Sequence, residues 1–289
     1  MLNDNCTLLI MSCDKYHTAW DPYFQLLNKY WPEHPERIVL STETMKYSFP
    51  GMNITTVNSI KGWTWSQRLK DCLTKISTDY IIFSLEDFFL QARVKHDRIE
   101  TCYEYMLKHA EVAVCRLKNS SNPDQVLGAE VIPDFYLAGP DVDFRLETQF
   151  ALWNRTVLLS YIDESESPWE FEAKGTKRIV DTPYQFLWYQ NPYGDRFISQ
   201  LIVPYVVGTD LGYGINWGKW LWKNKKLFRD NGITADFSEL GIIGPTQIRY
   251  RQFFSKAIYQ KDCRLPYVVF RLFYRVFHKI GRVLRKNSS

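Results

Sequence analysis

Two adjacent carboxylates, Glu86 and Asp87, lie between two apolar runs of the sequence. The run before them, Tyr80–Leu85, is rich in aromatic and β-branched residues and predicts a strand that helices cover on both faces. The run after them is Phe88–Leu90. Charges in this position are costly to bury without a cation or hydrogen-bond donors. The pair could therefore form a metal or nucleotide-sugar site, or it could be the solvated acids of a turn.

A second group of acids follows a predicted helix start near residue 168. Ser167 is a good N-cap, and Pro168 suits the first helical position. Glu170 and Glu172 then fall in the first turn, where the helix dipole favours negative charge. Acids in a first turn are also ordinary capping residues. The pattern alone therefore allows either a catalytic or a structural role.

The elements that would position these residues alternate between strand and helix up to residue 90. This alternation predicts a Rossmann-like nucleotide-binding half, and ligands of such sheets bind at the carboxyl ends of the strands. The sequence contains no GxGxxG and no P-loop, which argues against a dinucleotide enzyme or a P-loop kinase. The expected strands are Thr7–Ser12, Arg37–Leu40, Ile54–Val57 and Tyr80–Leu85, and the expected helices are Asp21–Trp31, with Asp21 as N-cap, and Trp65–Ile76.

The chain beyond residue 90 is less regular. We expect a helix over His96–Ala110, a strand over Val112–Leu117 and a strand that turns into a helix over 149–161. A strand pair is predicted over Arg178–Trp188 and a β-rich segment over Ile198–Val207. A glycine-rich loop at 212–218 has no known phosphate-loop spacing.

Composition limits the class of protein. The 289 residues suffice for one large α/β domain. Aromatic residues make up 16%, and their rings suit stacking on sugars or bases and, for Trp and Tyr, a membrane interface. The six cysteines form no CxxC pair, and no signal peptide or run of roughly 20 apolar residues is recognised. These features predict a cytoplasmic protein with reduced thiols.

The end of the chain differs from the rest in charge. From Arg264 onward there are seven Lys and Arg residues and no acid, whereas the remainder is mildly acidic. Over 266–286 the apolar and basic residues occupy opposite sides of a helix, as in helices that lie on anionic membranes. We predict a domain at 1–262 and a membrane-associating tail at 263–289, with the protein peripheral at the inner face of the cell membrane. A docked terminal helix is an alternative, and nucleic-acid binding is disfavoured because the acidic body would repel phosphates.

Three stretches resemble bacterial glycosyltransferases encoded with capsule and O-antigen genes. They are the opening segment 7–44, TDYIIFSLEDFFL at 78–90 and ESPWEFE at 166–172. The likeness covers most of residues 5–235. It implies an α/β, Rossmann-like GT-A fold: a mixed, mostly parallel sheet flanked by helices, here followed by an amphipathic C-terminal helix. It also implies transfer of a sugar from a nucleotide donor, such as a UDP-sugar, to a lipid-linked or polysaccharide acceptor in capsule, O-antigen or lipopolysaccharide synthesis.

The same resemblance implies roles for individual residues. Glu86 and Asp87 would occupy the place of the DxD motif, with Asp87 holding Mn²⁺ or Mg²⁺ on the donor diphosphate and Glu86 close to the donor. The pair is adjacent rather than spaced as in DxD, so the enzyme could instead be metal independent. Other residues placed near the donor are Asp14, Thr42, Ser66 and Arg68.

The segment Ser167-Pro168-x-Glu170 is also similar to the S-P-x-E segment of the core-2 N-acetylglucosaminyltransferases, which are metal-independent GT-A enzymes. That likeness implies an inverting transfer with Glu170 as general base and Lys219 as the cation that neutralises the diphosphate. Two alternatives remain open. One is a metal-dependent nucleotidyl or phosphoryl transferase that uses Glu86 and Asp87, and the other is a non-catalytic carbohydrate-binding protein at the membrane surface.

Overall fold

The computed structural model describes most of the chain, namely residues 2–119, 127–191, 197–205 and 214–248. The chain divides into two compact units, residues 1–242 and residues 243–289. Because only the first six residues of the second unit are described, the fold and the site below belong to the first unit. The predicted boundary after residue 262 and the predicted tail helix lie outside the described residues.

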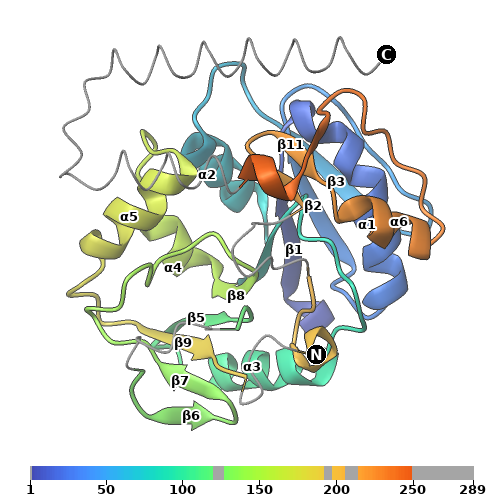
Figure 1. Cartoon of the computed structure of the whole chain (residues 1–289). Coiled ribbons are helices and arrows are strands. Elements are labelled where there is room, and N and C mark those ends of the chain that lie inside the picture. The colour runs from blue at the N-terminus through green and yellow to red at the C-terminus, as the bar shows by residue number, and fades with distance from the viewer. Residues whose placement is uncertain (1, 120–126, 192–196, 206–213, 249–289) are drawn as a thin grey trace, which may run out of the picture. The chain divides into compact units, whose positions relative to one another are not determined.

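A nine-stranded mixed sheet forms the centre of the first unit (Figure 1). Its spatial order is β3-β2-β1-β4-β8-β5-β9-β7-β6. Seven strands run in one direction, while β8 and β7 run against them. The predicted mixed, mostly parallel α/β sheet is therefore confirmed. The strands are β1 (Cys6–Met11), β2 (Arg37–Thr42), β3 (Asn53–Asn58), β4 (Tyr80–Leu85), β5 (Val112–Arg116), β6 (Glu130–Ile132), β7 (Phe135–Leu137), β8 (Ala151–Asn154) and β9 (Gln185–Tyr189).

Helices cover both faces of this sheet, and each face has its own hydrophobic core. Along β1, Leu8 and Ile10 enter the core that contains α1 and α3, while Leu9 and Met11 enter the core that contains α2, α4 and α5. Successive strand side chains point to opposite faces, so a strand buried on both faces needs apolar residues at every position. The helices are α1 (Trp20–Tyr30), α2 (Trp65–Lys75), α3 (His96–Lys108), α4 (Arg155–Ser160), α5 (Pro168–Arg178) and α6 (Asn224–Asp230), with short 3₁₀ turns η1 (Leu2–Asp4), η2 (Asp14–Ala19) and η4 (Ile198–Gln200).

Figure 1 shows α1 on one side of the sheet and α2, α4 and α5 on the other. In the part of the chain that the structure describes, none of the helices has the length and apolar character needed to cross a bilayer.

The prediction of a strand pair over Arg178–Trp188 is wrong. Helix α5 continues to Arg178, and only Gln185–Tyr189 forms a strand. The Arg178 guanidinium makes two hydrogen bonds to the buried carboxylate of Glu166. A cation also suits the last turn of a helix, because the carbonyl end of the helix dipole is negative. These long-range contacts favour helix where the sequence favoured strand.

Two smaller predictions are also wrong. Within 198–205, the chain forms η4 and a single bridge between Tyr205 and Leu90 rather than a strand. The apolar residues of this segment are buried by packing, and Leu201 and Ile202 lie in the core. Helix α1 begins at Trp20, so Asp21 is not its N-cap, and its carboxylate instead accepts a hydrogen bond of 2.6 Å from the Tyr47 hydroxyl.

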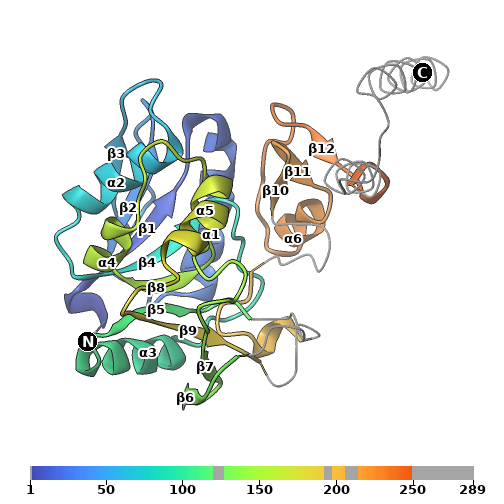
Figure 2. The ribbon, with the colours of Figure 1, turned by 90° about the vertical axis from the view of Figure 1, so that its left-hand side faces the viewer.

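Residues 214–243 include a second, three-stranded sheet with the order β10-β11-β12. Its strands are β10 (Ile215–Asn216), β11 (Lys219–Leu221) and β12 (Ile242–Ile243). Trp217 and Gly218 join β10 to β11, and both have positive φ, as a two-residue type I′ hairpin requires. Figure 2 shows β10, β11 and α6 grouped beside the nine-stranded sheet. The predicted loop at 212–218 thus forms this hairpin over its described part.

Candidate functional site

The two carboxylates Glu86 and Asp87 follow the last residue of β4, at the carboxyl edge of the sheet. They are 7% and 8% exposed, so the interpretation as solvated turn acids is wrong. Strand β1 pairs with β4 in parallel up to Met11 and Leu85, which brings the residue after β1, Ser12, next to the pair. Parallel strands end at the same edge, and this edge is where ligands of such sheets bind.

Burial sets the electrostatics of the pair. It raises the pKa of Glu86 well above its ordinary value, and the neighbouring charge of Asp87 adds to this, while Arg68 and the Ser12 hydroxyl act in the opposite direction. Burial also raises the pKa of Asp87 to about 6, although the Ile215 amide partly offsets the effect. Two buried acids that resist ionisation would gain from a nearby cation, since it removes the penalty for burying their charge.

Arg68 supplies positive charge beside the pair. It lies in the first turn of α2, which begins with a capping box formed by Thr64 and Gln67. The Arg68 Nη1 donates a hydrogen bond of 2.7 Å to the carbonyl oxygen of Ser12. The helix start thus holds the guanidinium at the ends of β1 and β4, beside Glu86.

The β10–β11 hairpin is distant from Asp87 in the sequence but is hydrogen-bonded to it. The amide of Ile215 donates to Asp87 Oδ2 at 3.0 Å, and the amide of Gly214 donates to the Asp87 carbonyl at 3.2 Å. A Cβ at Gly214 would lie 2.3 Å from the Phe89 ring, so only glycine fits this approach. At the hairpin turn, a Cβ on Gly218 would lie 3.1 Å from Lys15 Nζ. The hairpin therefore lies close to both Asp87 and Lys15.

Asp14 links the ends of β1 and β2. Its carboxylate accepts hydrogen bonds from the Glu43 amide at 2.9 Å, the Thr44 amide at 2.8 Å and the Thr44 hydroxyl at 2.6 Å. Burial acts to raise the pKa of Asp14, but these hydrogen bonds outweigh it and the pKa is lowered. Asp14 thus fixes the shape of the edge with an ionised side chain that is already well hydrogen-bonded.

Two further residues that were predicted to bind the nucleotide-sugar donor, Thr42 and Ser66, are buried near the carboxyl edge of the sheet. Thr42 ends β2, and its hydroxyl accepts a hydrogen bond of 2.9 Å from the Asn58 side chain. Ser66 lies in the first turn of α2 and is fully buried. Apart from Lys219, the residues predicted to bind the nucleotide-sugar donor lie at or just after the ends of β1, β2 and β4 or at the start of α2. The structure therefore places them at one edge of the sheet, because parallel strands end at the same edge.

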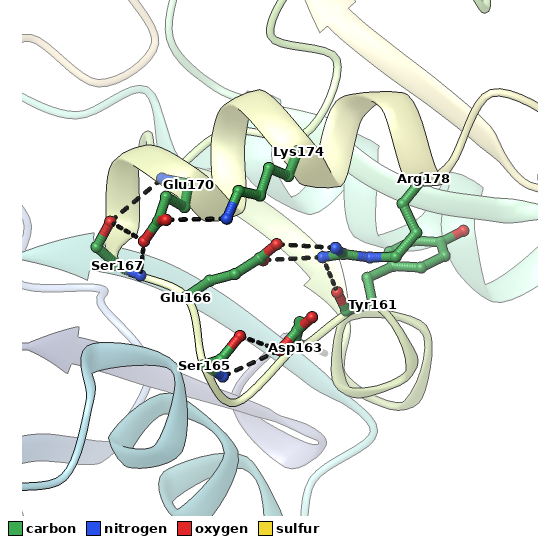
Figure 3. A network of polar contacts seen from close by, with 8 residues as sticks. All are labelled: Tyr161, Asp163, Ser165, Glu166, Ser167, Glu170, Lys174 and Arg178. Carbon is green, nitrogen blue, oxygen red and sulfur yellow. Dashed lines mark hydrogen bonds and ion pairs between the residues drawn. The ribbon is translucent and has the colours of Figure 1, made fainter.

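Glu170 closes a capping box at the start of α5 (Figure 3). Its Oε2 accepts hydrogen bonds from the Ser167 amide at 3.0 Å and the Ser167 hydroxyl at 2.8 Å, and its Oε1 lies 2.9 Å from Lys174 Nζ. The Ser167 amide and Lys174 lower the pKa of Glu170 to about 2. The side chain is 46% exposed, and no hydrogen bond or ion pair among the described residues joins it to Glu86 or Asp87.

Helix α5 is held beside α2, so Glu170 is connected to the edge through packing. The Trp65 and Phe171 rings are 5.6 Å apart, and the Thr64 hydroxyl donates to the Glu164 carbonyl. Glu166, in the same turn as Glu164, pairs with Arg178 at the other end of α5 (Figure 3). The capping role of Glu170 is thus visible in the structure, while its catalytic role stays a prediction.

Lys219 does not contact the carboxylate pair. It lies on β11, and its Nζ donates to the Leu240 carbonyl at 3.5 Å. Tyr16 lies closer to the carboxylates, because burial and the charges of Cys13, Glu86 and Asp87 raise its pKa, and Lys15 Nζ lies 5.4 Å from the centre of the Tyr16 ring. Sequence analysis missed both residues, although their position directly after β1 was a usable signal.

A second cluster that sequence analysis missed lies at the end of β5. The Arg116 Nε is 2.5 Å from Glu147 Oε1, and its guanidinium lies 4.1 Å from the centre of the Trp188 ring. Strand β5 runs in the same direction as β4, so this ion pair is at the same edge of the sheet. Nearby, Glu172 of α5 accepts hydrogen bonds from the Thr148 amide at 2.8 Å and the Thr148 hydroxyl at 2.6 Å.

The metal-binding capacity of the site is limited. Over the described ranges, no cluster of three or more His, Cys, Asp or Glu side chains could hold an ion. Glu86 and Asp87 nevertheless fit a different kind of site, in which one or two carboxylates and the phosphates of a substrate share an Mg²⁺-like ion. Their burial and raised pKa are consistent with carboxylates that a cation would stabilise in the ionised form.

Comparison with known proteins gives distant structural neighbours. No protein-family model matches the chain, and no curated protein is similar to it in sequence. S. aureus TarS aligns over 64% of this chain and 36% of its own, with 9% identity and a TM-score of 0.43. A mannosyltransferase from Pyrobaculum calidifontis, solved with GDP-Man and Mn²⁺, aligns over 65% and 55%, with 10% identity and a TM-score of 0.44.

A cytidylyltransferase from Leptospira borgpetersenii aligns over 66% of this chain and 78% of its own, with 12% identity and a TM-score of 0.40. The chain spans little more than a third of TarS and about half of the mannosyltransferase. At this level of similarity, the function of the chain has to be argued from its own residues.

Proposed function

We propose that the chain is a glycosyltransferase of the GT-A type that uses a nucleotide-sugar donor. The observation that carries the proposal is the buried pair Glu86 and Asp87 at the carboxyl end of β4, with Arg68 beside it. A donor diphosphate is strongly anionic, so it needs positive charge from a bound ion or from basic side chains. This edge offers ligands for an ion, and it holds Arg68 and Lys15 as well.

In this proposal Glu86 and Asp87 would hold Mn²⁺ or Mg²⁺ beside the donor diphosphate, where such an ion would supply positive charge. Arg68 and Lys15 orient the same phosphates, and Asp14 holds the loop after β2 in place. The hairpin amide of Ile215 keeps Asp87 in a fixed position. A metal-independent reaction would rest on the two basic residues instead.

We retain Glu170 as the proposed general base of an inverting transfer. A carboxylate with a pKa near 2 is a weak base, so the acceptor hydroxyl would have to replace Ser167 or Lys174 as its partner. Neighbouring Trp169 is 77% exposed, and it could provide a stacking surface for an acceptor sugar. Glu172 of α5, which accepts a hydrogen bond from the Thr148 amide, is the alternative candidate for the general base.

A nucleotidyl transferase is the second candidate, because the same carboxylate pair could hold an ion beside a reacting phosphorus atom. The two reactions break different bonds. Transfer of the sugar breaks the anomeric C–O bond and releases a nucleoside diphosphate, whereas attack of water at phosphorus breaks the diphosphate bridge and releases a nucleoside monophosphate and a sugar 1-phosphate. Slow donor hydrolysis, in which water replaces the acceptor, is enough to distinguish them.

We expect ³¹P NMR of the full chain incubated with UDP-sugars and magnesium to reveal UDP as the phosphorus product. Boiled protein is the control for spontaneous hydrolysis. Accumulation of UMP and sugar 1-phosphate would assign the site to the nucleotidyl transferase reaction instead.

We also propose that residues 263–289 bind an anionic membrane and bring the enzyme to a lipid-linked or polysaccharide acceptor of capsule, O-antigen or lipopolysaccharide type. The separation of basic and apolar residues in their sequence supports this. We expect the full chain to sediment with vesicles that contain anionic lipid, and a chain truncated before Arg264 to remain in the supernatant. Neutral vesicles are the control, and equal sedimentation of both chains would contradict the proposal.

A further inference from the structure

A cavity of about 580 Å³ lies between the end of α1 and helix α6. Its volume is in the range of sites that bind small molecules or short saccharides. Helix α1 starts next to the candidate site and, at 1.5 Å per residue, its 11 residues separate its two ends by about 16 Å. The residues that carry the argument are Tyr30, Trp222, Lys223, Lys226, Asp230 and Asn231.

Hydrogen bonds fix the wall of this cavity in place. The Asn231 Oδ1 accepts from the Tyr30 hydroxyl at 2.7 Å and from Lys29 Nζ at 2.8 Å. The Asn231 amide nitrogen donates to the Leu227 carbonyl at 2.8 Å. The end of α1 and the end of α6 are thus tied together by one side chain. A cavity with a fixed wall loses little entropy on binding a ligand.

The lining combines aromatic rings with cations. Trp222 and Tyr30 supply the rings, with Lys223 Nζ 5.4 Å from the Trp222 ring centre and Lys29 Nζ 5.3 Å from that of Tyr30. Lys226 pairs with Asp230, which is the one acid among the lining residues that the structure describes. The cations therefore exceed the acids at this cavity, so a ligand with negative charge is favoured.

We propose that this cavity binds an acidic saccharide chain. The rings suit the apolar faces of sugar rings, and the lysines suit carboxylate or phosphate substituents. A lone phosphate would leave most of the volume unfilled, whereas a short oligosaccharide would fill it. The inference concerns binding alone, so it stands whether or not the carboxylate edge transfers a sugar.

The proposal is tested by isothermal titration of the full chain in metal-free buffer. The probes are tetragalacturonate, the neutral sugar maltotetraose and inorganic tripolyphosphate. We expect tetragalacturonate to bind at least tenfold more tightly than either of the others. Trp222→Ala and Lys226→Gln should each weaken the binding of tetragalacturonate tenfold or more. Trp222→Phe keeps an aromatic ring and should retain most of the wild-type affinity.

Lys225→Gln is the matched control. It removes the same charge from the same helix, but Lys225 Nζ lies 6.0 Å from the Phe237 ring and does not line the cavity. We expect Lys225→Gln to change the affinity less than twofold. Equal losses for Lys225→Gln and Lys226→Gln, tighter binding of tripolyphosphate, or no binding of tetragalacturonate would each overturn the proposal. Melting curves of each variant separate lost binding from lost folding.

Discussion

Asp87→Asn is expected to stabilise the folded chain near pH 8 and to abolish donor turnover. Asp87 is buried and its pKa is raised to about 6, so the ionised side chain is unfavourable in the folded state at neutral pH. Asparagine has the same shape and keeps an oxygen that can accept from the Ile215 amide. The ionised Asp87 side chain lowers the stability of the folded chain, and residues of this kind are expected at functional sites.

The pH dependence of this effect has a definite sign. The pKa of Asp87 is higher in the folded chain than its ordinary value of 3.8, so the folded state binds more protons between those two values. Stability is therefore greatest below the ordinary pKa and falls as pH rises through about 6. The advantage of Asp87→Asn should be largest above this pKa and should disappear toward pH 4.

Thermal melts of the wild type and Asp87→Asn across this range measure the effect. The exposed carboxylate of Asp181 provides the control, because Asp181→Asn removes an equal charge outside the site. Two results would contradict the account that burial disfavours the ionised form of Asp87. One is a melting temperature of Asp87→Asn below that of the wild type at pH 8, and the other is a difference in melting temperature that does not change with pH.

Glu170→Gln is expected to reduce sugar transfer by about 10²–10⁴-fold while leaving the dissociation constant of the donor unchanged. Glutamine cannot take the acceptor proton, but its oxygen can still accept from Ser167 at the helix start. The expected loss is therefore in kcat rather than in folding. Turnover close to that of the wild type would rule out Glu170 as the base, and a collapse of activity in Glu172→Gln would assign the role to that neighbour.

Ser167→Ala separates the capping role from the catalytic one. It removes the hydroxyl of the capping box and is expected to cost about 1 kcal/mol of stability, but it leaves the carboxylate in place. The Ser167 hydroxyl lowers the pKa of Glu170, so its loss should raise that pKa. The acidic limb of the pH–rate profile should then move to higher pH, with transfer retained.

The first half of the fold was predictable because three of its strands, β1, β2 and β4, are buried on both faces. Such strands are almost continuously apolar, as Tyr80–Leu85 is apart from Ser84, and Pro or polar residues mark their ends. The later strands β6 and β7 have three residues each, which is too short for a periodic pattern. Arg178 was misassigned because its partner, Glu166, lies 12 residues earlier in the sequence, outside any local pattern.

The candidate site was predictable only where local sequence determines it. Glu86 and Asp87 stand out because apolar runs flank them, but the amide that contacts Asp87 comes from residue 215, 128 positions later. The side of β11 on which Lys219 lies could not be predicted either, because a three-residue strand is too short for a pattern that identifies its buried face. The pairing of Arg116 with Glu147 likewise depends on how β5 and the segment before β8 meet.

The central claim is that the carboxylates after β4 receive the diphosphate of a nucleotide sugar, and its most direct test is a donor-dependent thermal shift. Wild type and Asp87→Asn are melted with UDP-, GDP-, CMP- and dTDP-sugars, with and without manganese. We predict that at least one donor raises the melting temperature of the wild type, and that Asp87→Asn loses this rise although it is the more stable protein. No shift with any donor, or an equal shift in both proteins, would contradict the claim.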